Sequence, residues 1–591
     1  MISEGDHSYS IIFSKPTDMR FKNTNGTYKI YAVTGTNTIA FGIDCNEADM
    51  QKLLGFTIEK EYTKSNGQHV RVTVMGFKVF KERIENPLPG GLYSTYDNPI
   101  QSFVWEDFSA YPNNQYRYHF TPLFDDPMNI RRGQAVSITV RTEPTWKAND
   151  HSVFFNRGVA SSQAYAMRFG NANPDNVQGA YEWLSRGLKE AIIAFIKQAQ
   201  NGDKIYGSFY EFRHDEILTA FKEAAIKGVE LHIIYDAKDN QHIDSQSGDL
   251  IESFPKLENE KATARVGLDN MPNVELTPRD RNKSYLSHNK FMVLEHQGKL
   301  VRVWTGSTNI SKGGIFGQAN VGHSIEDEQA ATKYKSYWDK LKTQPTSAVL
   351  KSANEQIQPN VVVANIPQGV SCIFNPRTNL DILQFYANLL DSINECGCIT
   401  FAFSVHQFFQ EALSDNTSSS PLTFLLLEKD DPDISDYVYQ NNVVKAVGSY
   451  IANNELYKWV RETNTNALQL NTHVMYIHTK FLLKDPLSND PIVVTGSANF
   501  SQASTNENDE NMLIIRGNTR VADTYFTEFF RLFNHYYFRW IARKLSEQGS
   551  VDFDNPAFLK PNDSWTEQYK AGKYKRKRVD IFVNMANADN G

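Results

Sequence analysis

Two separate stretches of the chain carry the same set of chemically active side chains. The first holds His288, Lys290, Ser307 and Asn309, and the second holds His478, Lys480, Ser497 and Asn499. An imidazole can attack phosphorus or move a proton, an ammonium group neutralises an anion, and hydroxyl and carboxamide groups donate hydrogen bonds. Two such sets around one point suit a tetrahedral phosphodiester, whose equatorial oxygens gain charge during reaction. We therefore expect the two stretches to share one site that cleaves a phosphodiester.

The two stretches keep one spacing throughout. Each also contains an acid, Glu295 or Asp485, and a later polar residue, Asn320 or Glu510. Subtraction gives 190 for the pairs 288/478, 290/480, 295/485, 306/496, 309/499 and 320/510. Chance matches of single residues would not hold six positions in register, so the pattern indicates an internal repeat.

The residues around each set predict two strands. In His-x-Lys the side-chain period of a strand is two, so both side chains project to the same face. Apolar residues follow each lysine, as in a buried strand, and a second strand-like run (300–304 and 492–494) leads to each Gly-Ser-x-Asn. Glycine lets the backbone approach a ligand, and ligands of parallel sheets commonly bind at strand ends.

This set of side chains suits covalent catalysis. One imidazole would form a phosphohistidine, while the other would protonate the leaving alcohol and then activate water. These roles need opposite protonation states, so we expect the pKa values of the two imidazoles to be pushed apart. The lysines supply the positive charge that a metal ion would otherwise supply, so we expect neither a metal nor a cofactor.

The doubled His-x-Lys-x4-acid motif with its following Gly-Ser-x-Asn closely resembles the phospholipase D superfamily, over about residues 175–545. The resemblance implies a two-lobed α/β/α/β/α fold with one active site at the lobe interface and ping-pong cleavage through phosphohistidine. It also implies that His288 is the nucleophile and His478 the general acid. Glu295 stands where the family usually has Asp, while Asp485 is regular, and both acids are expected to lie behind the reacting groups rather than among them.

The resemblance also gives the later polar pair a role. In relatives a carboxylate at this place can orient the imidazole, so Asn320 opposite Glu510 implies that the two histidines are not equivalent. A binding module with a silent site is disfavoured, because all six histidine, lysine and asparagine side chains are present.

Periodicity predicts a two-part chain. Residues 1–150 contain short alternating runs, such as 9–13, 28–33 and 135–140, and are predicted to form a β-sandwich-like domain without a chemical motif. Tandem α/β units are predicted at 160–350 and 360–550, built from strand–helix–strand patterns typical of a parallel sheet. The first unit opens with a predicted helix at 181–196, and the two units together form one pseudo-two-fold catalytic core.

Composition narrows the class of protein. The 591 residues are 40% hydrophobic and carry a formal net charge of −7, which excludes a generally basic nucleic-acid coat. Four cysteines are too few for a disulfide scaffold, and Cys396-Gly-Cys398 lacks the spacer of a zinc knuckle. We find no signal peptide and no apolar run of about 20 residues, so we expect a cytoplasmic protein with at most peripheral membrane contact.

Two classes of substrate fit these residues. A phospholipid, cleaved or transferred between phosphate and head group, is the leading prediction, and DNA or RNA at the same site is the alternative. The C-terminal tail, 551–591, contains six basic residues within 570–578, which indicate either a solvated segment or contact with phosphates. The predicted site does not require an oligomer.

Overall fold

The described part of the chain covers most of both predicted units and most of the N-terminal region. The computed structural model describes residues 19–88, 91–147, 150–158, 165, 168–170, 172–237, 240–243, 250–253, 255–280, 285–431, 433–434, 442–448, 476–547 and 557–590. The strand predicted at 9–13 lies outside these residues.

Two seven-stranded sheets form the centre of the molecule, and their strands follow the same spatial order. The first sheet runs β12 (His151–Phe155), β20 (Val321–Ile325), β19 (Lys299–Gly306), β18 (Lys290–His296), β13 (Lys204–Phe209), β14 (Glu230–Asp236) and β17 (Val274–Arg279). The second runs β21 (Gly369–Asn375), β27 (Glu510–Arg516), β26 (Ile492–Gly496), β25 (Phe481–Lys484), β22 (Cys396–Phe401), β23 (Leu422–Leu427) and β24 (Val443–Val447). The predicted repeat is therefore a repeat of whole sheets.

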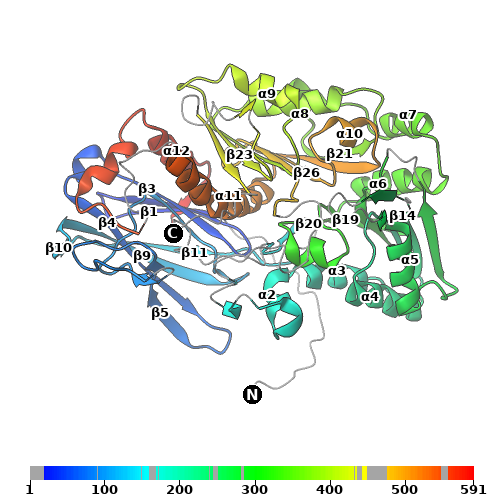
Figure 1. Ribbon diagram of the computed structural model, residues 1–591, viewed down its shortest axis with the longest axis horizontal. Helices are drawn as coiled ribbons and strands as arrows, with labels where there is room; N and C mark the ends of the chain where they lie inside the picture. Colours follow the sequence, from blue (N-terminus) through cyan, green and yellow to red (C-terminus); the bar gives the residue numbers. More distant parts are fainter. Residues whose placement is uncertain are drawn as a thin grey trace.

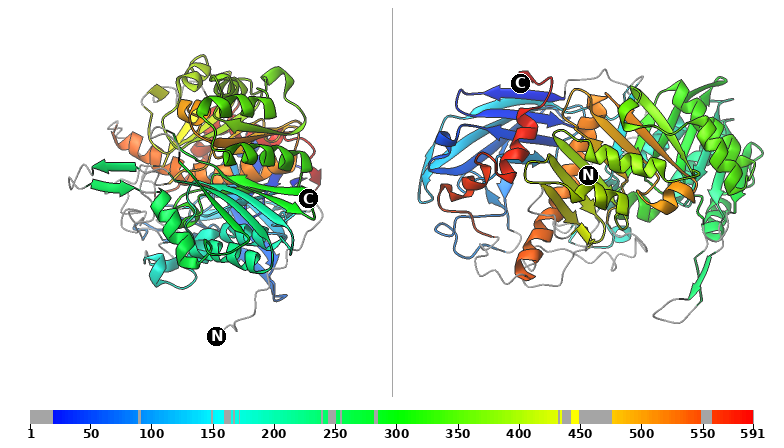
Figure 2. Two further views of the ribbon diagram at one scale, coloured as in Figure 1. Left: turned by 90° about the vertical axis from the view of Figure 1, so that its right-hand side faces the viewer. Right: turned by 90° about the horizontal axis from the view of Figure 1, so that it is seen from above.

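Helices lie between the two sheets and on their outer faces (Figure 1). The inner layer consists of α6 (Glu328–Lys342) and α11 (Thr519–Glu547), and apolar residues of both sheets join one core with them. The outer layers consist of α3 (Leu188–Lys197), α4 (Asp215–Ile226) and α5 (Pro255–Val266) on one side, and α8 (Asp381–Asp391), α9 (Gln407–Ser414) and α10 (Gln502–Asn506) on the other. This confirms two tandem α/β/α units. Helix α7 (Ser347–Ile357) follows α6, and a hairpin of β15 (Asn240–Ile243) and β16 (Leu250–Ser253) projects from the first unit (Figure 2).

The sheets are mixed rather than parallel, which corrects the prediction. Strand β13 pairs in parallel with β14 but antiparallel with β18, and β22 does the same with β23 and β25. The βαβ pattern correctly identified the parallel strands, but the three strands that carry the motifs return as antiparallel neighbours. The start of β18 therefore meets the end of β13, where Phe209 lies opposite Lys290.

The helix predicted at 181–196 is broken in two. Helix α2 (Ala180–Ser185) ends at Arg186, whose φ is 50°, and α3 begins after Gly187, whose φ is 90°. Two successive residues in the left-handed region redirect the chain, and glycine takes this conformation without steric cost. The apolar periodicity runs through both helices, which is why the pattern alone predicts one helix.

The N-terminal region is β-rich, as predicted, and forms two antiparallel sheets around a shared core. One sheet holds β1 (Arg20–Thr24), β2 (Lys29–Thr34), β3 (Ile39–Asp44) and β8 (Val104–Asp107). The other holds β5 (His69–Thr73), β4 (Leu53–Thr63), β9 (Gln115–Asp126), β10 (Asn129–Arg132) and β11 (Val136–Arg141), and β6 (Met75–Gly76) pairs with β7 (Tyr93–Ser94) beside them.

The basic C-terminal segment is folded onto this N-terminal region, so a solvated tail is wrong for residues 557–590. The segment forms the 3-10 helix η8 (Asp563–Tyr569), helix α12 (Tyr574–Val583) and strand β28 (Asp589–Asn590), which pairs with β1. Arg576 bonds Asp44 at 2.8 Å and Arg578 bonds Glu106 at 3.3 Å. Carboxylates of the N-terminal sheets therefore already neutralise two of the basic side chains.

Candidate active site

The two motif histidines face each other across the boundary between the units. His288 lies two residues before β18 and His478 lies three residues before β25, and both side chains are buried. Their ring centroids are 6.4 Å apart and their planes make an angle of 73°. This separation leaves the two rings on opposite sides of a point at which a single phosphorus atom would fit.

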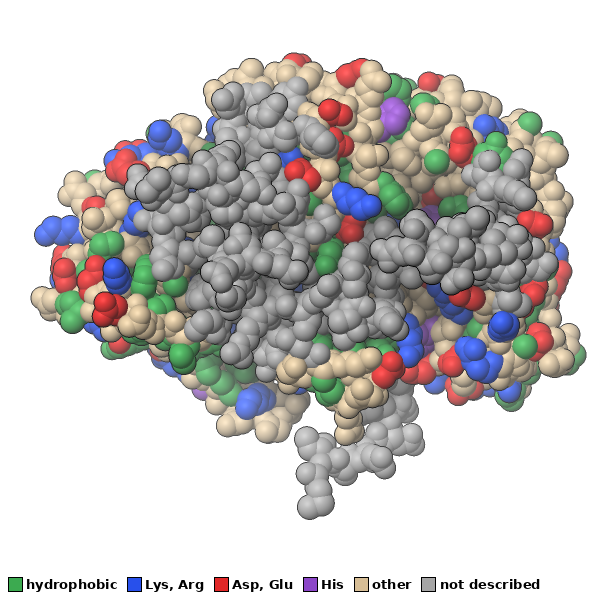
Figure 3. Space-filling view, in the orientation of Figure 1, with side chains coloured by type: hydrophobic (Ala, Val, Ile, Leu, Met, Phe, Trp, Pro, Cys, Tyr) green, Lys and Arg blue, Asp and Glu red, His purple; other side chains and the backbone are tan. Residues whose placement is uncertain are grey.

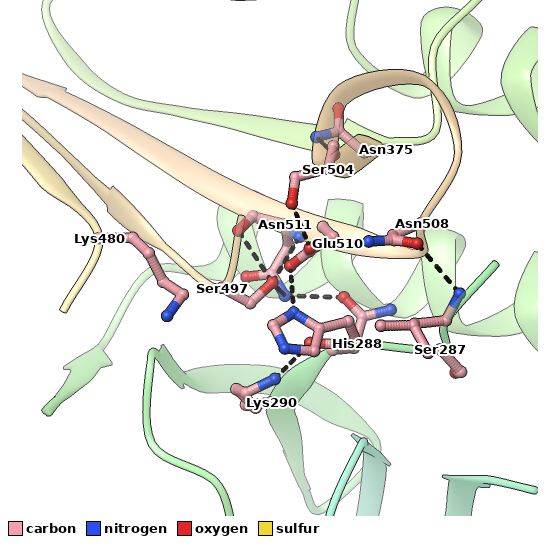
Figure 4. Close-up of polar contacts among 12 residues, drawn as sticks. Ser287, His288, Lys290, Asn375, Lys480, Ser497, Ser504, Asn508, Glu510 and Asn511 are labelled. Atoms are coloured by element: carbon pink, nitrogen blue, oxygen red, sulfur yellow. Dashed lines mark hydrogen bonds and ion pairs between the residues drawn. The ribbon is translucent and has the colours of Figure 1, made fainter. Parts of the chain in front are cut away.

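Each imidazole is held by a residue of the opposite unit. Nδ1 of His288 lies 2.9 Å from Oε2 of Glu510, at the start of β27 (Figure 4). Nδ1 of His478 lies 2.9 Å from Oδ1 of Asn320, just before β20. The contacts obey the 190-residue spacing, but one partner is a carboxylate and the other is a carboxamide.

Backbone bridges join the units beside these contacts. Ser287 pairs with Asp509, and Ala319 pairs with Ile477. The two bridges are also related by 190 residues, and the backbone N–H of His478 donates to the Ala319 carbonyl at 3.1 Å. The residue before each histidine is thus paired through its backbone with the unit that supplies the histidine's side-chain partner.

The surrounding hydrogen bonds determine which ring nitrogen carries the proton. Asn320 donates through Nδ2 to the Gly314 carbonyl at 2.7 Å and accepts through Oδ1 from Ser307 Oγ at 2.7 Å. Oδ1 therefore faces His478, so Nδ1 of His478 donates and its Nε2 remains for chemistry. Glu510 acts in the same way on His288, and Ser504 Oγ donates to its other oxygen at 2.9 Å.

The two lysines lie directly beside the histidines, and Figure 4 shows Lys290 and Lys480 flanking His288. Nζ of Lys290 donates to the His288 carbonyl at 2.6 Å, and Nζ of Lys480 donates to the His478 carbonyl at 2.5 Å. Both side chains are buried, at 2% and 0% exposure. Two ammonium groups that are buried close together, away from water, favour the binding of an anion between them.

Burial shifts the protonation of the whole group. It lowers the pKa of both histidines well below the usual value, and the charges of Lys290 and Lys480 lower them further. Burial likewise lowers the pKa of Lys290 to about 8 and raises the pKa of Glu510 to about 7. The pKa values of both imidazoles are lowered, so the predicted opposite shifts are not found, and the asymmetry between the two histidines lies in their partners, a carboxylate and a carboxamide.

The remaining predicted polar residues divide into two groups. Asn309 and Asn499 both have a buried Oδ1 for which the described residues supply no hydrogen-bond partner. Ser497 Oγ accepts from the Asn511 backbone at 3.0 Å and Ser307 Oγ from the Val321 backbone at 3.0 Å, so the serines fix the loops that carry the asparagines.

Glu295 and Asp485 do not join the histidines. Glu295 lies five residues along β18 from Lys290, about 16 Å away in an extended strand, and accepts from Tyr206 Oη at 3.0 Å. Asp485 follows β25 and accepts backbone hydrogen bonds from Asn394, Glu395 and Cys396 at 2.8–3.1 Å. Both acids stabilise the far ends of their strands.

Two residues near the site were missed in the sequence. The ring of Tyr210 lies 5.0 Å from that of His288, and Nζ of Lys290 lies 5.2 Å from its centroid. Strand pairing matches Tyr210 to Ala402 in the second unit, so only one side of the site has this ring. The strand-like run at 204–210, which ends at Tyr210, was the available signal in the sequence.

Asn156 is the second missed residue. It is fully buried, accepts from the Asn320 backbone N–H at 2.9 Å and donates to the Ile315 and Gln318 carbonyls at 2.7 Å each. Asn156 therefore holds the loop that carries the partner of His478. It lies outside both motifs, and no local pattern distinguishes it from a turn residue.

Two other kinds of feature are absent from the described ranges. No group of three or more His, Cys, Asp or Glu side chains there is arranged to hold a metal ion. None of the helices described there combines the length and apolar character needed to span a bilayer.

Comparison with known proteins identifies the family to which the chain is similar. A family model described as cardiolipin synthase, PLD-like domain, matches residues 192–342 and 392–533, while no curated protein sequence matches. Among solved structures, Haemophilus influenzae phosphatidylserine synthase shares 11% identity over 62% of this chain and 92% of its own, with a TM-score of 0.41. Yeast tyrosyl-DNA phosphodiesterase shares 12% over 63% and 91%, with a TM-score of 0.31.

A Porphyromonas gingivalis polyphosphate kinase shares 9% identity over 55% of this chain, which spans 43% of the length of the kinase, with a TM-score of 0.35. The family model matches once in each unit, and each match includes one His-x-Lys pair. The chain therefore belongs to the phospholipase D superfamily, whose members act on phosphodiesters.

Proposed function

We propose that the protein is a phosphodiesterase that works through a covalent phosphohistidine. The observation that supports this most directly is the pair of imidazoles 6.4 Å apart, each presenting Nε2 because its Nδ1 is bonded to a residue of the opposite unit. Both units are needed to form this arrangement, because each supplies the hydrogen-bond partner of the other unit's histidine.

His288 is the proposed nucleophile. Its Nε2 attacks phosphorus, a P–N bond forms and the P–O bond to the leaving group breaks. The attacking ring becomes positively charged, and the Glu510 carboxylate at 2.9 Å stabilises that charge. The neutral Asn320 offers His478 no such help, which favours this order over the reverse.

His478 is the proposed general acid and base. Its Nε2–H gives a proton to the leaving oxygen, and the neutral ring then takes a proton from the water or alcohol that attacks phosphorus and breaks the P–N bond. Burial lowers its pKa, and a phosphodiester anion bound between the rings would raise it. Lys290, Lys480, Asn309 and Asn499 stabilise the charge on the equatorial oxygens. No step uses a metal ion or a cofactor.

The proposed substrate is a phospholipid. The match to a family model described as cardiolipin synthase supports a lipid, with water or an alcohol as acceptor. Among the side chains coloured in Figure 3, acidic and basic ones are interspersed. Contact with the membrane would then be peripheral.

One parallel assay tests both reaction and substrate. Vesicles of phosphatidylcholine and phosphatidylglycerol, single- and double-stranded DNA, and RNA are each incubated with the protein, with the double variant His288→Ala/His478→Ala as the blank. We expect lipid turnover and, after denaturation in alkali, which also removes the acyl chains, an added glycerophosphoryl mass on a peptide containing His288. If the protein turns over nucleic acid but not lipid, the substrate is a nucleic acid rather than a phospholipid. Turnover by the double variant would refute the mechanism.

A further inference from the structure

A second cavity lies away from the two histidines, between the N-terminal sheets and the first unit. Its volume is about 850 Å³, and its walls include Arg157, Arg168 and Arg186 beside the rings of Tyr111 and Trp183. None of the motif residues of the proposed active site lines it. The volume falls in the range of cavities that hold small organic ligands, roughly 300–1,000 Å³.

The arginines are short of carboxylate partners. Among the described lining residues the one acid is Glu182, which is exposed. Arg186 bonds Glu528 at 2.8 Å, but Arg531 shares that carboxylate at 2.6 Å, and Nη2 of Arg186 is buried without a hydrogen-bond partner in the described part of the chain. The described residues therefore bring more positive charge to the site than their own acids neutralise.

Arg157 has even fewer partners. Its guanidinium lies 4.3 Å from the ring centroid of Trp183, and its Nε is buried with no hydrogen-bond partner among the described residues. Burial, together with the charges of Arg186 and Arg531, lowers its pKa to about 9. A buried guanidinium nitrogen without an acceptor is uncommon in folded proteins and calls for an anion or water.

The break between α2 and α3 adds a further positive group. Gly187 is the N-cap of α3, makes no side-chain capping bond and lines the cavity. The N-terminus of this ten-residue helix carries a partial positive charge, which favours a phosphate, although Ser185 Oγ already accepts from the Lys189 N–H at 2.9 Å. The helix break that the sequence did not reveal is thus part of the cavity wall.

The aromatic side of the cavity completes its chemistry. Tyr111 is 65% exposed although it is a large ring, and Phe108 and Trp183 are partly exposed. Flat rings next to arginines bind planar, phosphate-bearing ligands by stacking on one part and by charge-assisted hydrogen bonds to the other. We propose that this cavity is a binding site for a small phosphate ester of a planar ring compound, of the nucleotide class, distinct from the catalytic site.

Calorimetric titration of the 591-residue protein tests the proposal. The probes are adenosine monophosphate, adenosine and inorganic phosphate. We expect the nucleotide to bind more tightly than either fragment, and the variant Arg157→Gln/Arg168→Gln to weaken nucleotide binding at least about ten-fold, since it removes charge-assisted hydrogen bonds to the phosphate. The matched control is Arg117→Gln, an exposed arginine of β9 outside the cavity, which should leave the dissociation constant unchanged.

Two further variants separate this site from the catalytic one. Lys480→Gln should leave a nucleotide-binding event intact, because Lys480 does not line the cavity. Arg168→Gln alone changes an exposed side chain, so it keeps the test valid if the double variant does not fold. Equal affinity of the wild type and the folded arginine variants, equal binding of adenosine and its monophosphate, or no binding at all would overturn the proposal.

Discussion

Glu510 accepts a hydrogen bond from Nδ1 of His288 at 2.9 Å although the two residues belong to different units and lie 222 positions apart. The equivalent contact on the other side joins His478 to Asn320. Neither unit alone can orient its own histidine, so the duplicated sequence forms one site only when the two sheets face each other. The exchange of carboxylate for carboxamide is what makes the two halves chemically different.

Glu510→Gln should reduce kcat/KM about ten- to a hundred-fold and change its pH dependence. The pKa of Glu510 is raised to about 7, so its carboxylate is lost as the pH falls through 7 and present above it. Wild-type kcat/KM should therefore rise with pH through about 7, and the variant, which cannot ionise at this position, should lack that limb. Rate measurements between pH 5.5 and 8.5 would check both.

Glu230→Gln is a suitable control for this experiment because Glu230 lies at the start of β14 and pairs with Lys204. Its pH profile should match the wild type. A Glu510→Gln profile with the same limb would assign that ionisation to another group.

The activity of His478→Ala should depend strongly on the leaving group, whereas His288→Ala should be inactive whatever the leaving group is. A p-nitrophenyl ester expels a stable anion that needs no proton, so His478→Ala should still form the phosphohistidine on it and release a burst of nitrophenol. On a lipid or alkyl diester it should be nearly inactive. His288→Ala should give no burst on either, because the group that attacks phosphorus is missing.

Stopped-flow measurement of nitrophenol release separates these outcomes. A burst from His288→Ala and none from His478→Ala would exchange the two roles. A wild-type steady-state rate from either variant would end the shared-site mechanism, since the pair acts as a unit.

Asn156→Ala should act through Asn320 rather than on substrate directly. Removing its side chain leaves the Asn320 backbone N–H without an acceptor and frees the loop at Gln318, so His478 should be less well oriented. We expect kcat on an alkyl diester to fall about ten-fold, with little change in the rate of the nitrophenol burst on a p-nitrophenyl ester. In a double-mutant cycle with Asn320→Ala the effects should be non-additive, since both act on one proton transfer; additive effects would contradict a positioning role.

The sequence predicts much of this arrangement because duplication is a strong signal. A constant spacing of 190 residues is enough to place His288, His478 and their partners in equivalent positions. Local periodicity is weaker. It carries no signal for the left-handed backbone conformation of Arg186 and Gly187, which divides one apolar pattern between two helices.

Contacts between distant segments are the part that the sequence could not supply. Tyr210 reaches His288 only because β13 pairs with β18, and Asn156 reaches Asn320 because β12 pairs with β20. The same holds for the basic segment, where Arg576 finds Asp44 across 532 positions. Charge composition alone leaves such a segment undecided between solvent, phosphate and carboxylate partners.

Asp485→Asn should lower stability without lowering activity. The Asp485 carboxylate accepts backbone N–H groups of Asn394, Glu395 and Cys396, while an asparagine offers one oxygen and turns a donor toward the others. A buried donor left unpaired costs roughly 1–3 kcal/mol, so the thermal midpoint should fall by a few degrees. Glu295→Gln alters one contact to Tyr206, so its thermal midpoint should fall less.

The contrast with a catalytic role is direct. Both carboxylates lie at the far end of the strand from the lysine of their motif, so kcat of each folded variant should stay within about two-fold of the wild type. Thermal unfolding and steady-state rates on the same preparations measure both quantities. A loss of kcat with an unchanged midpoint would mean that the acid acts on the reacting groups across the length of β18 or β25, and a stable Asp485→Asn would mean that the amides it caps find other acceptors.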